Sequence, residues 1–111
     1  MWIMVAGPYS AGAADATARA ANLRALNAAA LAVWRKGHVP IIGVNLALPI
    51  IEAAGPDHYD AIMMPVSLAL AERCDACLRV GGASTGADQE VARFRATGRP
   101  VYFALGEVPA A

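Results

Sequence analysis

The stretch Gly81-Gly82-Ala83-Ser84-Thr85-Gly86-Ala87-Asp88-Gln89-Glu90 decides the fold. It follows a short apolar run, Ala76-Cys77-Leu78-Arg79-Val80, and it opens a segment of helical character that reaches Gly98. This order predicts a strand, a glycine-containing turn and the start of a helix. Ser84 is suited to be the N-cap of that helix, because its hydroxyl oxygen can accept a hydrogen bond from the N–H of Gly86 or Ala87.

The predicted helix start has the features of an anion site. A first helical turn carries about four unpaired N–H groups and the positive end of the helix dipole. The glycines at 81, 82 and 86 leave room for a group such as phosphate. Glu90 lies six residues beyond Ser84, about 9 Å along the axis, and its side chain leans back toward the N-terminus. An ordinary capped helix with a solvent-facing glutamate would show the same pattern.

The composition predicts one cytoplasmic domain that spans residues 1–111. With 111 residues, 58% of them hydrophobic and 16% charged, the chain is long enough for a single core and is not disordered. The net charge of zero excludes a basic surface for a nucleic acid polymer. No apolar run reaches the ~18 residues of a membrane span, and the first residues lack a basic leader. Low charge with high apolar content favours a homodimer or a higher homo-oligomer.

Hydrophobic patterning divides the chain into alternating strands and helices. Strands are predicted at 2–6, 38–42, 76–80 and 101–104, and helices at 13–36, from 56 or 57 to 73, and from 84 to 98. Residues 46–54 fit either a short helix or an apolar loop. Pro40 places the second strand at a sheet edge, and Pro65 predicts a kink or a break in its helix. Residues 105–111 are expected to pack loosely or against a neighbouring subunit.

Strands that alternate with helices predict an α/β fold with a parallel sheet of four to five strands between two helical layers. Right-handed crossovers favour the flavodoxin-like, Rossmann-like order 2-1-3-4. In such a sheet the ligand binds beyond the carboxyl ends of strands 1 and 3. The loops at 7–12 and 81–86 are therefore expected to meet at one site.

Several short motifs occur in order along nearly the whole chain: Ala6-Gly7-Pro8-Tyr9, Cys74-Asp75-Ala76, Ser84-x-Gly86-x-x-x-Glu90 and Gly98-Arg99-Pro100-Val101. Together they resemble the nucleoside 2-deoxyribosyltransferase superfamily, which includes the 2'-deoxynucleoside 5'-phosphate N-hydrolases. The spacing from serine to glutamate is the most specific of these motifs. The resemblance implies a single flavodoxin-like domain and a homo-oligomer in which neighbouring subunits share sites.

The resemblance also implies a site and a chemistry. Glu90 matches the glutamate that attacks C1' of the sugar, as in a retaining glycosidase. Ser84, with Gly86, matches the phosphate-binding position of the monophosphate hydrolases, whereas transferases of free nucleosides carry an aspartate there. Further substrate contacts are expected from the first loop, at Gly7, Pro8 and Ser10. The mechanism needs neither a metal nor an organic cofactor, and the helix N-terminus is expected to keep Glu90 ionised.

Two positions depart from the family pattern. Ser67 stands where the enzymes have an aspartate near the sugar and the leaving base, and serine supplies no proton with a useful pKa. Ile3 stands where the transferases have a tyrosine that touches the nucleophile. Ser67 is kept as a substrate contact, and Asp60, Glu72 or a partner subunit is expected to replace the missing acid. Tyr9 is expected to approach Glu90 from the first loop.

Three functions follow from these residues. The first is hydrolysis of the N-glycosidic bond of a nucleoside 5'-monophosphate, with Glu90 as nucleophile and Tyr9 and Asp60 as further catalytic residues. The second is deoxyribosyl transfer between bases with a nucleoside as substrate, against which Ser84 argues. The third is a nucleotide-binding module without catalysis, which Ser67 favours.

Other reactive residue types have structural interpretations. Cys74 and Cys77 are too few ligands for a structural zinc site, which needs four. They are interpreted as reduced, half-buried thiols. His38 is interpreted as a residue at the start of a strand, not as a catalyst. The run from 57 to 60 fits either a polar helix N-terminus or a direct role in the site, and Met63 and Met64 fit a core or a subunit interface.

Overall fold

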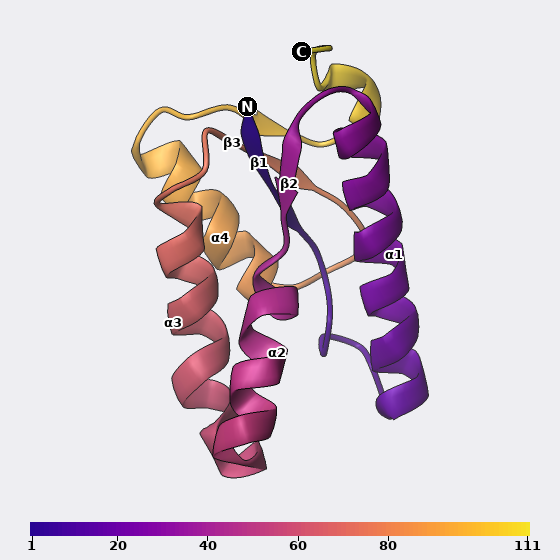
Figure 1. The fold of residues 1–111 in the computed structure, drawn as a ribbon, viewed down its shortest axis with the longest axis vertical. Helices are drawn as coiled ribbons and strands as arrows, with labels where there is room; N and C mark the ends of the chain where they lie inside the picture. The colour runs from indigo at the N-terminus through magenta and orange to yellow at the C-terminus, as the bar shows by residue number, and fades with distance from the viewer.

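The computed structural model describes all residues from 1 to 111 and has a four-stranded parallel sheet at its centre. The strands are β1 (Trp2–Ala6), β2 (Val39–Ile41), β3 (Ala76–Arg79) and β4 (Val101–Tyr102). Their order is β2-β1-β3-β4, and every neighbouring pair is parallel (Figure 1). The predicted flavodoxin-like order is confirmed, with four strands rather than five and with β2 at an edge.

The helices are α1 (Ala16–Arg35), α2 (Gly43–Ala54), α3 (Tyr59–Ala71) and α4 (Thr85–Ala96). Short 3-10 helices at Pro56–His58 and Leu105–Glu107 complete the chain. α1 begins three residues later than predicted, because Asp15 is its N-cap and accepts from the N–H of Ala18 at 2.8 Å. None of the four helices is long and apolar enough to cross a membrane.

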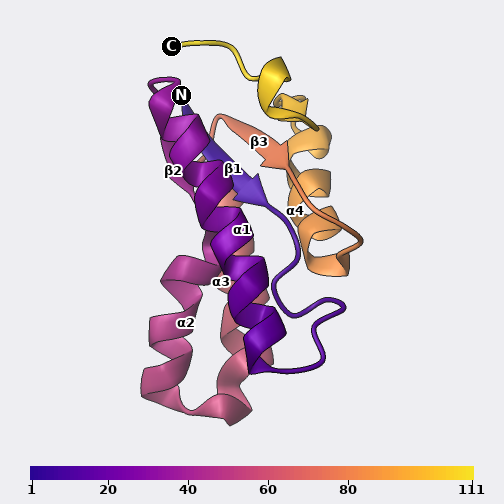
Figure 2. The same cartoon turned by 90° about the vertical axis from the view of Figure 1, so that its right-hand side faces the viewer.

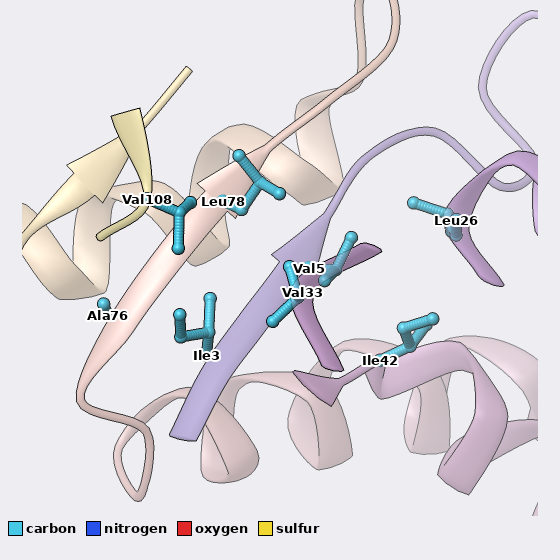
Figure 3. Packing of buried hydrophobic residues seen from close by; sticks show 8 residues of the cluster. All are labelled: Ile3, Val5, Leu26, Val33, Ile42, Ala76, Leu78 and Val108. Carbon is cyan, nitrogen blue, oxygen red and sulfur yellow. The ribbon is translucent and has the colours of Figure 1, made fainter. Parts of the chain in front are cut away.

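Alternating side chains of β1 separate two core clusters, one on each face of the sheet. Ile3 and Val5 point to the α1 side, and Met4 and Ala6 point to the side of α3 and α4. Figure 3 shows the first cluster, which contains Ile3, Val5, Leu26, Val33, Ile42, Ala76, Leu78 and Val108. The second is formed by Met4, Ala6, Ala71, Cys74, Cys77, Ala87, Val91 and Phe94. The molecule is therefore a three-layer sandwich.

α2 and α3 form a helical pair that extends beyond the carboxyl end of the sheet (Figure 2). The uncertain segment after β2 is a helix, because Ala47 and Ile51 bury one side of it against Met63 of α3. Of the kink or break predicted at Pro65, the break is wrong. α3 continues past this exposed proline, since packing on α2 outweighs the loss of one backbone hydrogen bond.

The expectation for the C-terminal residues is also wrong, because they pack on their own chain. Val108 is 2% exposed and joins the core cluster beside Ala76 and Leu78 (Figure 3). The ammonium group of Lys36 donates to the carbonyl oxygens of Leu105 and Val108, at 2.8 and 2.6 Å. These contacts cover the part of the sheet that α1 does not reach.

The loops after β1 and β3 touch one another, as the fold predicts. Gly81 has φ of +77°, and a Cβ built on it would lie 2.8 Å from Cδ of Pro8. A Cβ on Gly7 would lie 2.7 Å from the carbonyl oxygen of Val80. These glycines let the two loops approach closely at the carboxyl end of the sheet.

Candidate functional site

A cleft of about 290 Å³ lies beyond the carboxyl ends of β1 and β3. It is enclosed by the loop after β1, the first residues of α2, the first half of α3 and the first turns of α4. Its lining residues are Gly7, Tyr9, Ser10, Ala11, Val44, Tyr59, Asp60, Met63, Met64, Ser84, Thr85, Gly86, Ala87, Gln89 and Glu90. The cleft thus lies at the switch point where the strand order predicts a ligand.

One end of the cleft is polar and is built by the start of α4. Ser84 is the N-cap, as predicted, and its hydroxyl oxygen accepts from the N–H of Ala87 at 3.1 Å. The N–H groups of Thr85 and Gly86 belong to the first turn, where no helical carbonyl can reach them. They are therefore available to an anion in the cleft.

Glu90 lies on the buried side of α4, and its side chain lines the cleft. The residue is only 8% exposed, and this burial raises the pKa of its carboxyl group to about 7, although the positive charge of Arg79 acts in the opposite direction. The helix N-terminus is expected to help keep Glu90 ionised, but with this pKa part of the carboxyl groups stay protonated at neutral pH. Desolvation outweighs the dipole, because the dipole effect is worth at most a few tenths to ~2 kcal/mol.

The spacing of apolar residues in α4 already contains the signal for this burial. Ala87, Val91 and Phe94 are buried, and Glu90 belongs to the same i, i+3, i+4, i+7 stripe. A glutamate within the apolar stripe of a helix predicts a desolvated carboxyl group. The sequence interpretation used the distance from Ser84 and overlooked this stripe.

Arg79 fixes the turn that separates β3 from the cleft. Its guanidinium group donates to the carbonyl oxygens of Val80 and of Gly82, the latter at 2.8 Å, and lies 3.5 Å from a carboxylate oxygen of Asp88. The Arg79 side chain is only 11% exposed, whereas that of Asp88 is 73% exposed. Arg79 thus stabilises the turn by hydrogen bonds, and its positive charge acts to lower the pKa of Glu90.

The other end of the cleft is apolar and aromatic. Tyr9 and Tyr59 pack against the α2–α3 core, and Met63 and Met64 continue the wall. The hydroxyl of Tyr59 donates to Oγ of Ser10 at 3.4 Å and joins α3 to the first loop. Met63 is also buried in the α2–α3 core, as the sequence predicts. Tyr59 belongs to the run from 57 to 60, of which only Asp60 was selected for the site.

Most predicted site residues line this cleft, and two do not. Asp60 is exposed at the cleft wall. Pro8 packs on Gly81 instead of lining the cleft. Ser67 is 3% exposed at the contact of α3 with α2, where a Cβ built on Gly43 would lie 2.1 Å from the Ser67 hydroxyl oxygen. Ser67 therefore serves close helix packing.

A larger and more open hollow of about 1060 Å³ lies on the far side of the Gly81–Ala83 turn. Its two cationic side chains, Arg79 and Arg95, already make contacts within the chain. Arg79 holds the turn, and the Arg95 guanidinium lies 5.5 Å from the centre of the Phe103 ring. Size alone would favour this hollow, but the smaller cleft contains the open helix start and the buried carboxyl group.

The remaining candidates have structural surroundings. Burial raises the pKa of the Cys74 thiol to about 11 and that of Cys77 to about 12, so both thiols stay protonated. No group of three or more metal-ligating side chains exists in the structure. Nδ1 of His38 lies 2.8 Å from the Met1 amine, and Nε2 lies 2.6 Å from the carbonyl oxygen of Pro109. His38 thus connects the two ends of the chain, away from the cleft.

Comparison of the chain with family models, with curated proteins and with solved structures gave no match. The geometry of the cleft and the motifs of the sequence are therefore the observations that bear on function.

Proposed function

We propose that this protein hydrolyses the N-glycosidic bond of a nucleoside 5'-monophosphate, with Glu90 as the nucleophile. One observation carries the proposal. A carboxyl group that is 8% exposed lines the same cleft as the open N-terminus of α4. A buried carboxyl group with a pKa near 7 is typical of a functional site.

The two ends of the cleft suit the two ends of a nucleotide. The phosphate would accept hydrogen bonds from the N–H groups of Thr85 and Gly86 and from the Ser84 hydroxyl. The base would contact the wall of Tyr9, Tyr59 and the two methionines. A volume of about 290 Å³ lies at the low end of small-molecule sites, which favours a mononucleotide over a dinucleotide.

The proposed reaction has two steps. In the first, a carboxylate oxygen of Glu90 bonds to C1', and the bond from C1' to the base nitrogen breaks. Its electron pair stays on the base, which takes up one proton. In the second, a water oxygen bonds to C1', the ester bond to Glu90 breaks, and the released water proton goes to a base in the cleft. The products are free base and sugar 5-phosphate, and Glu90 is regenerated.

We propose Asp60 as the group that gives the proton to the leaving base and takes the proton of the water. Ser67 occupies the position of the family acid but packs on Gly43 outside the cleft lining, whereas Asp60 lies in that lining. The exposure of Asp60 favours the alternative of a non-catalytic nucleotide binder. Hydrolysis is favoured because binding alone gives no reason to bury Glu90.

The test is release of free base from a panel of ribo- and deoxyribonucleoside 5'-monophosphates, followed by chromatography. We expect release from at least one member, reduced by roughly 10³-fold or more in Glu90→Ala. Glu52→Ala is the matched control, because Glu52 is exposed on α2 and is not part of the cleft lining. This control is expected to retain the wild-type rate.

Calorimetric binding of the same nucleotides separates the alternatives. Nucleotide binding without base release would select the binding module and overturn the hydrolase proposal. Incorporation of labelled free base into nucleoside would select deoxyribosyl transfer. Neither binding nor release by any member would overturn the assignment of the cleft to nucleotides.

A further inference from the structure

The candidate cleft contains an anion site and an unpartnered carboxyl group. The N–H groups of Thr85 and Gly86, with the Ser84 hydroxyl, form what we call the α4 anion site. Glu90 lines the same cleft, is 8% exposed, and its carboxyl group makes no hydrogen bond or ion pair within the chain. No fully buried side-chain oxygen lacks a partner, so the unbonded oxygens of Glu90 reach the space of the cleft.

The α4 anion site and the Glu90 carboxyl group lie close together. Gly86 and Glu90 are four residues apart, so they lie on the same face of α4 with a rise of about 6 Å between them. The side chain of a helical residue leans back toward the N-terminus, here toward Gly86. A bound phosphate is therefore separated from the carboxyl group by roughly one Debye length, ~8 Å at physiological ionic strength. Salt screens a buried pair less than an exposed one, so two negative charges here repel each other.

No cation lines the cleft to balance two negative charges. Its 15 lining residues include no arginine, lysine or histidine, and Asp60 of α3 adds an exposed carboxylate. Arg79 of β3 is the cation that acts on Glu90, but it already donates to the carbonyl oxygen of Gly82 and lies 3.5 Å from Asp88. The positive charge that a bound phosphate needs must therefore come from elsewhere.

The other titratable groups around Glu90 supply no positive charge. Tyr9 of the first loop and Tyr59 of α3 contribute phenol groups to the lining, and α2 contributes no polar side chain. Cys77 of β3 and the preceding Cys74 also interact with Glu90, and burial raises the pKa of these thiols to about 12 and about 11. Burial raises the pKa of Glu90 to about 7, so its carboxylate can take up a proton near neutral pH.

We propose that a phosphate group enters the α4 anion site together with one proton from solvent, which binds to Glu90; the position of the phosphate rests on the proposed function. The protonated carboxyl group is neutral, so it removes the repulsion, and it can donate a hydrogen bond to the ligand. The contribution of Glu90 to affinity is constant below the pKa of the free protein. It falls as pH rises above that value, by up to tenfold per pH unit, until the pKa of the complex is passed.

This linkage regulates the proposed reaction through its own substrate and product. Glu90 must be ionised to attack C1', whereas a bound phosphate favours the protonated form. The pH profile of kcat reports the pKa in the complex, and that of kcat/KM reports the pKa in the free enzyme. The acidic limb of kcat is therefore expected at higher pH than that of kcat/KM. The product, a sugar 5-phosphate, is expected to inhibit more strongly at pH 7.5 than at pH 8.5.

The test is calorimetric titration of the full chain with ribose 5-phosphate and with 2-deoxyribose 5-phosphate, which have no base to release. At pH 8 a phosphate monoester, with a second pKa of ~6, is already a dianion. Titrations in two buffers of different ionisation enthalpy count the protons taken up. We expect roughly half to one proton per bound sugar phosphate, and affinity about three- to tenfold weaker at pH 8.5 than at pH 7.5.

Two variants locate the proton. Glu90→Gln has a neutral amide, so we expect it to bind both sugar phosphates without proton uptake and with equal affinity at the two pH values. Glu52→Gln is the matched control, because Glu52 is exposed on α2 outside the cleft lining, and it should retain the uptake of the wild type. The proton count and the pH dependence are measured on the wild type, so they remain valid if a variant fails to fold.

The outcomes separate the linkage from the proposed function. Binding of a sugar phosphate to the wild type without proton uptake would overturn the linkage, and so would equal uptake in Glu90→Gln. Both results leave the proposed hydrolysis standing, because base release measures it separately. Absence of binding by either sugar phosphate at both pH values would overturn the linkage together with the phosphate site of the proposed function.

Discussion

Burial of the Glu90 carboxyl group makes the stability of the fold depend on pH. Its pKa rises from 4.5 to about 7 on folding, so the folded chain holds a proton that the unfolded chain releases between these values. The associated stability is fully present below about pH 4.5 and is lost as pH rises through 7. Each pKa unit corresponds to 1.36 kcal/mol, so the cost above pH 7 is roughly 3 kcal/mol.

Replacing Glu90 by glutamine should remove this pH dependence. The amide has a similar shape and does not ionise, so Glu90→Gln is expected to raise the free energy of unfolding at pH 8 by roughly 3 kcal/mol relative to its effect at pH 4. Urea unfolding at the two pH values measures the difference. Glu52→Gln, at an exposed position, is the control. An equal effect of Glu90→Gln at both pH values would contradict a pKa near 7.

For Glu90, the sequence predicted a position close to the start of α4 but not whether the carboxyl group is ionised. The spacing of Ser84 and Glu90 is local and could be counted along one helix. Whether Glu90 is ionised depends on how much protein surrounds it, which is set by the sheet and by α3. Likewise, Ser67 lost its expected place in the site because Gly43, distant in sequence, packs against it.

Two helices of the fold begin with the same type of cap, which allows a matched comparison. Asp15 and Ser84 each accept from the N–H three residues later, at 2.8 and 3.1 Å. Only Ser84 lines the candidate cleft. A comparison of the two caps therefore distinguishes an effect on helix stability from an effect on ligand binding.

We expect Asp15→Ala and Ser84→Ala each to lower the free energy of unfolding by about 1 kcal/mol, because each leaves one amide without its partner. Only Ser84→Ala should also weaken nucleoside 5'-monophosphate binding, with a smaller effect on the nucleoside that lacks the phosphate. Denaturation and calorimetry provide the two measurements. Equal loss of nucleotide affinity in both variants would show that Ser84 has no direct contact with the ligand.

The elements themselves were predictable where their pattern is local. Apolar runs and the cap at Ser84 predicted most of them. Residues 46–54 were left between helix and loop, because the segment is mostly apolar and contains Pro49. Burial of Ala47 and Ile51 against α3 decides in favour of the helix, and that contact exists only in the folded chain.

The order of the strands was predictable at the scale of the molecule, because right-handed crossovers leave few alternatives. The place of the C-terminal residues was not. Val108 enters the core beside Ala76 and Leu78, and nothing in its local sequence distinguishes this valine from an exposed one. Such a contact between distant parts of the chain depends on which area of the sheet the helices leave uncovered.

Val108→Ala tests this role of the C-terminal residues. Removing two methyl carbons from a side chain that is 2% exposed is expected to cost ~1–3 kcal/mol of unfolding free energy. Leu105→Ala, in the same segment but 39% exposed, should cost less than ~1 kcal/mol. Chemical denaturation compares the two variants. A negligible effect of Val108→Ala would mean that the segment is not part of the core.

The central position of β1 has a consequence for biosynthesis. Ile3 pairs with Ala76, so a strand made at the start of translation waits for a partner 73 residues later (76 − 3). At ~5–20 residues per second this delay lasts roughly 4–15 s. During that time the apolar strand lacks β3 and α4, and only the elements up to α3 are available to shield it on the ribosome. Codon choice between β2 and β3 would therefore influence how much of the newly made protein aggregates.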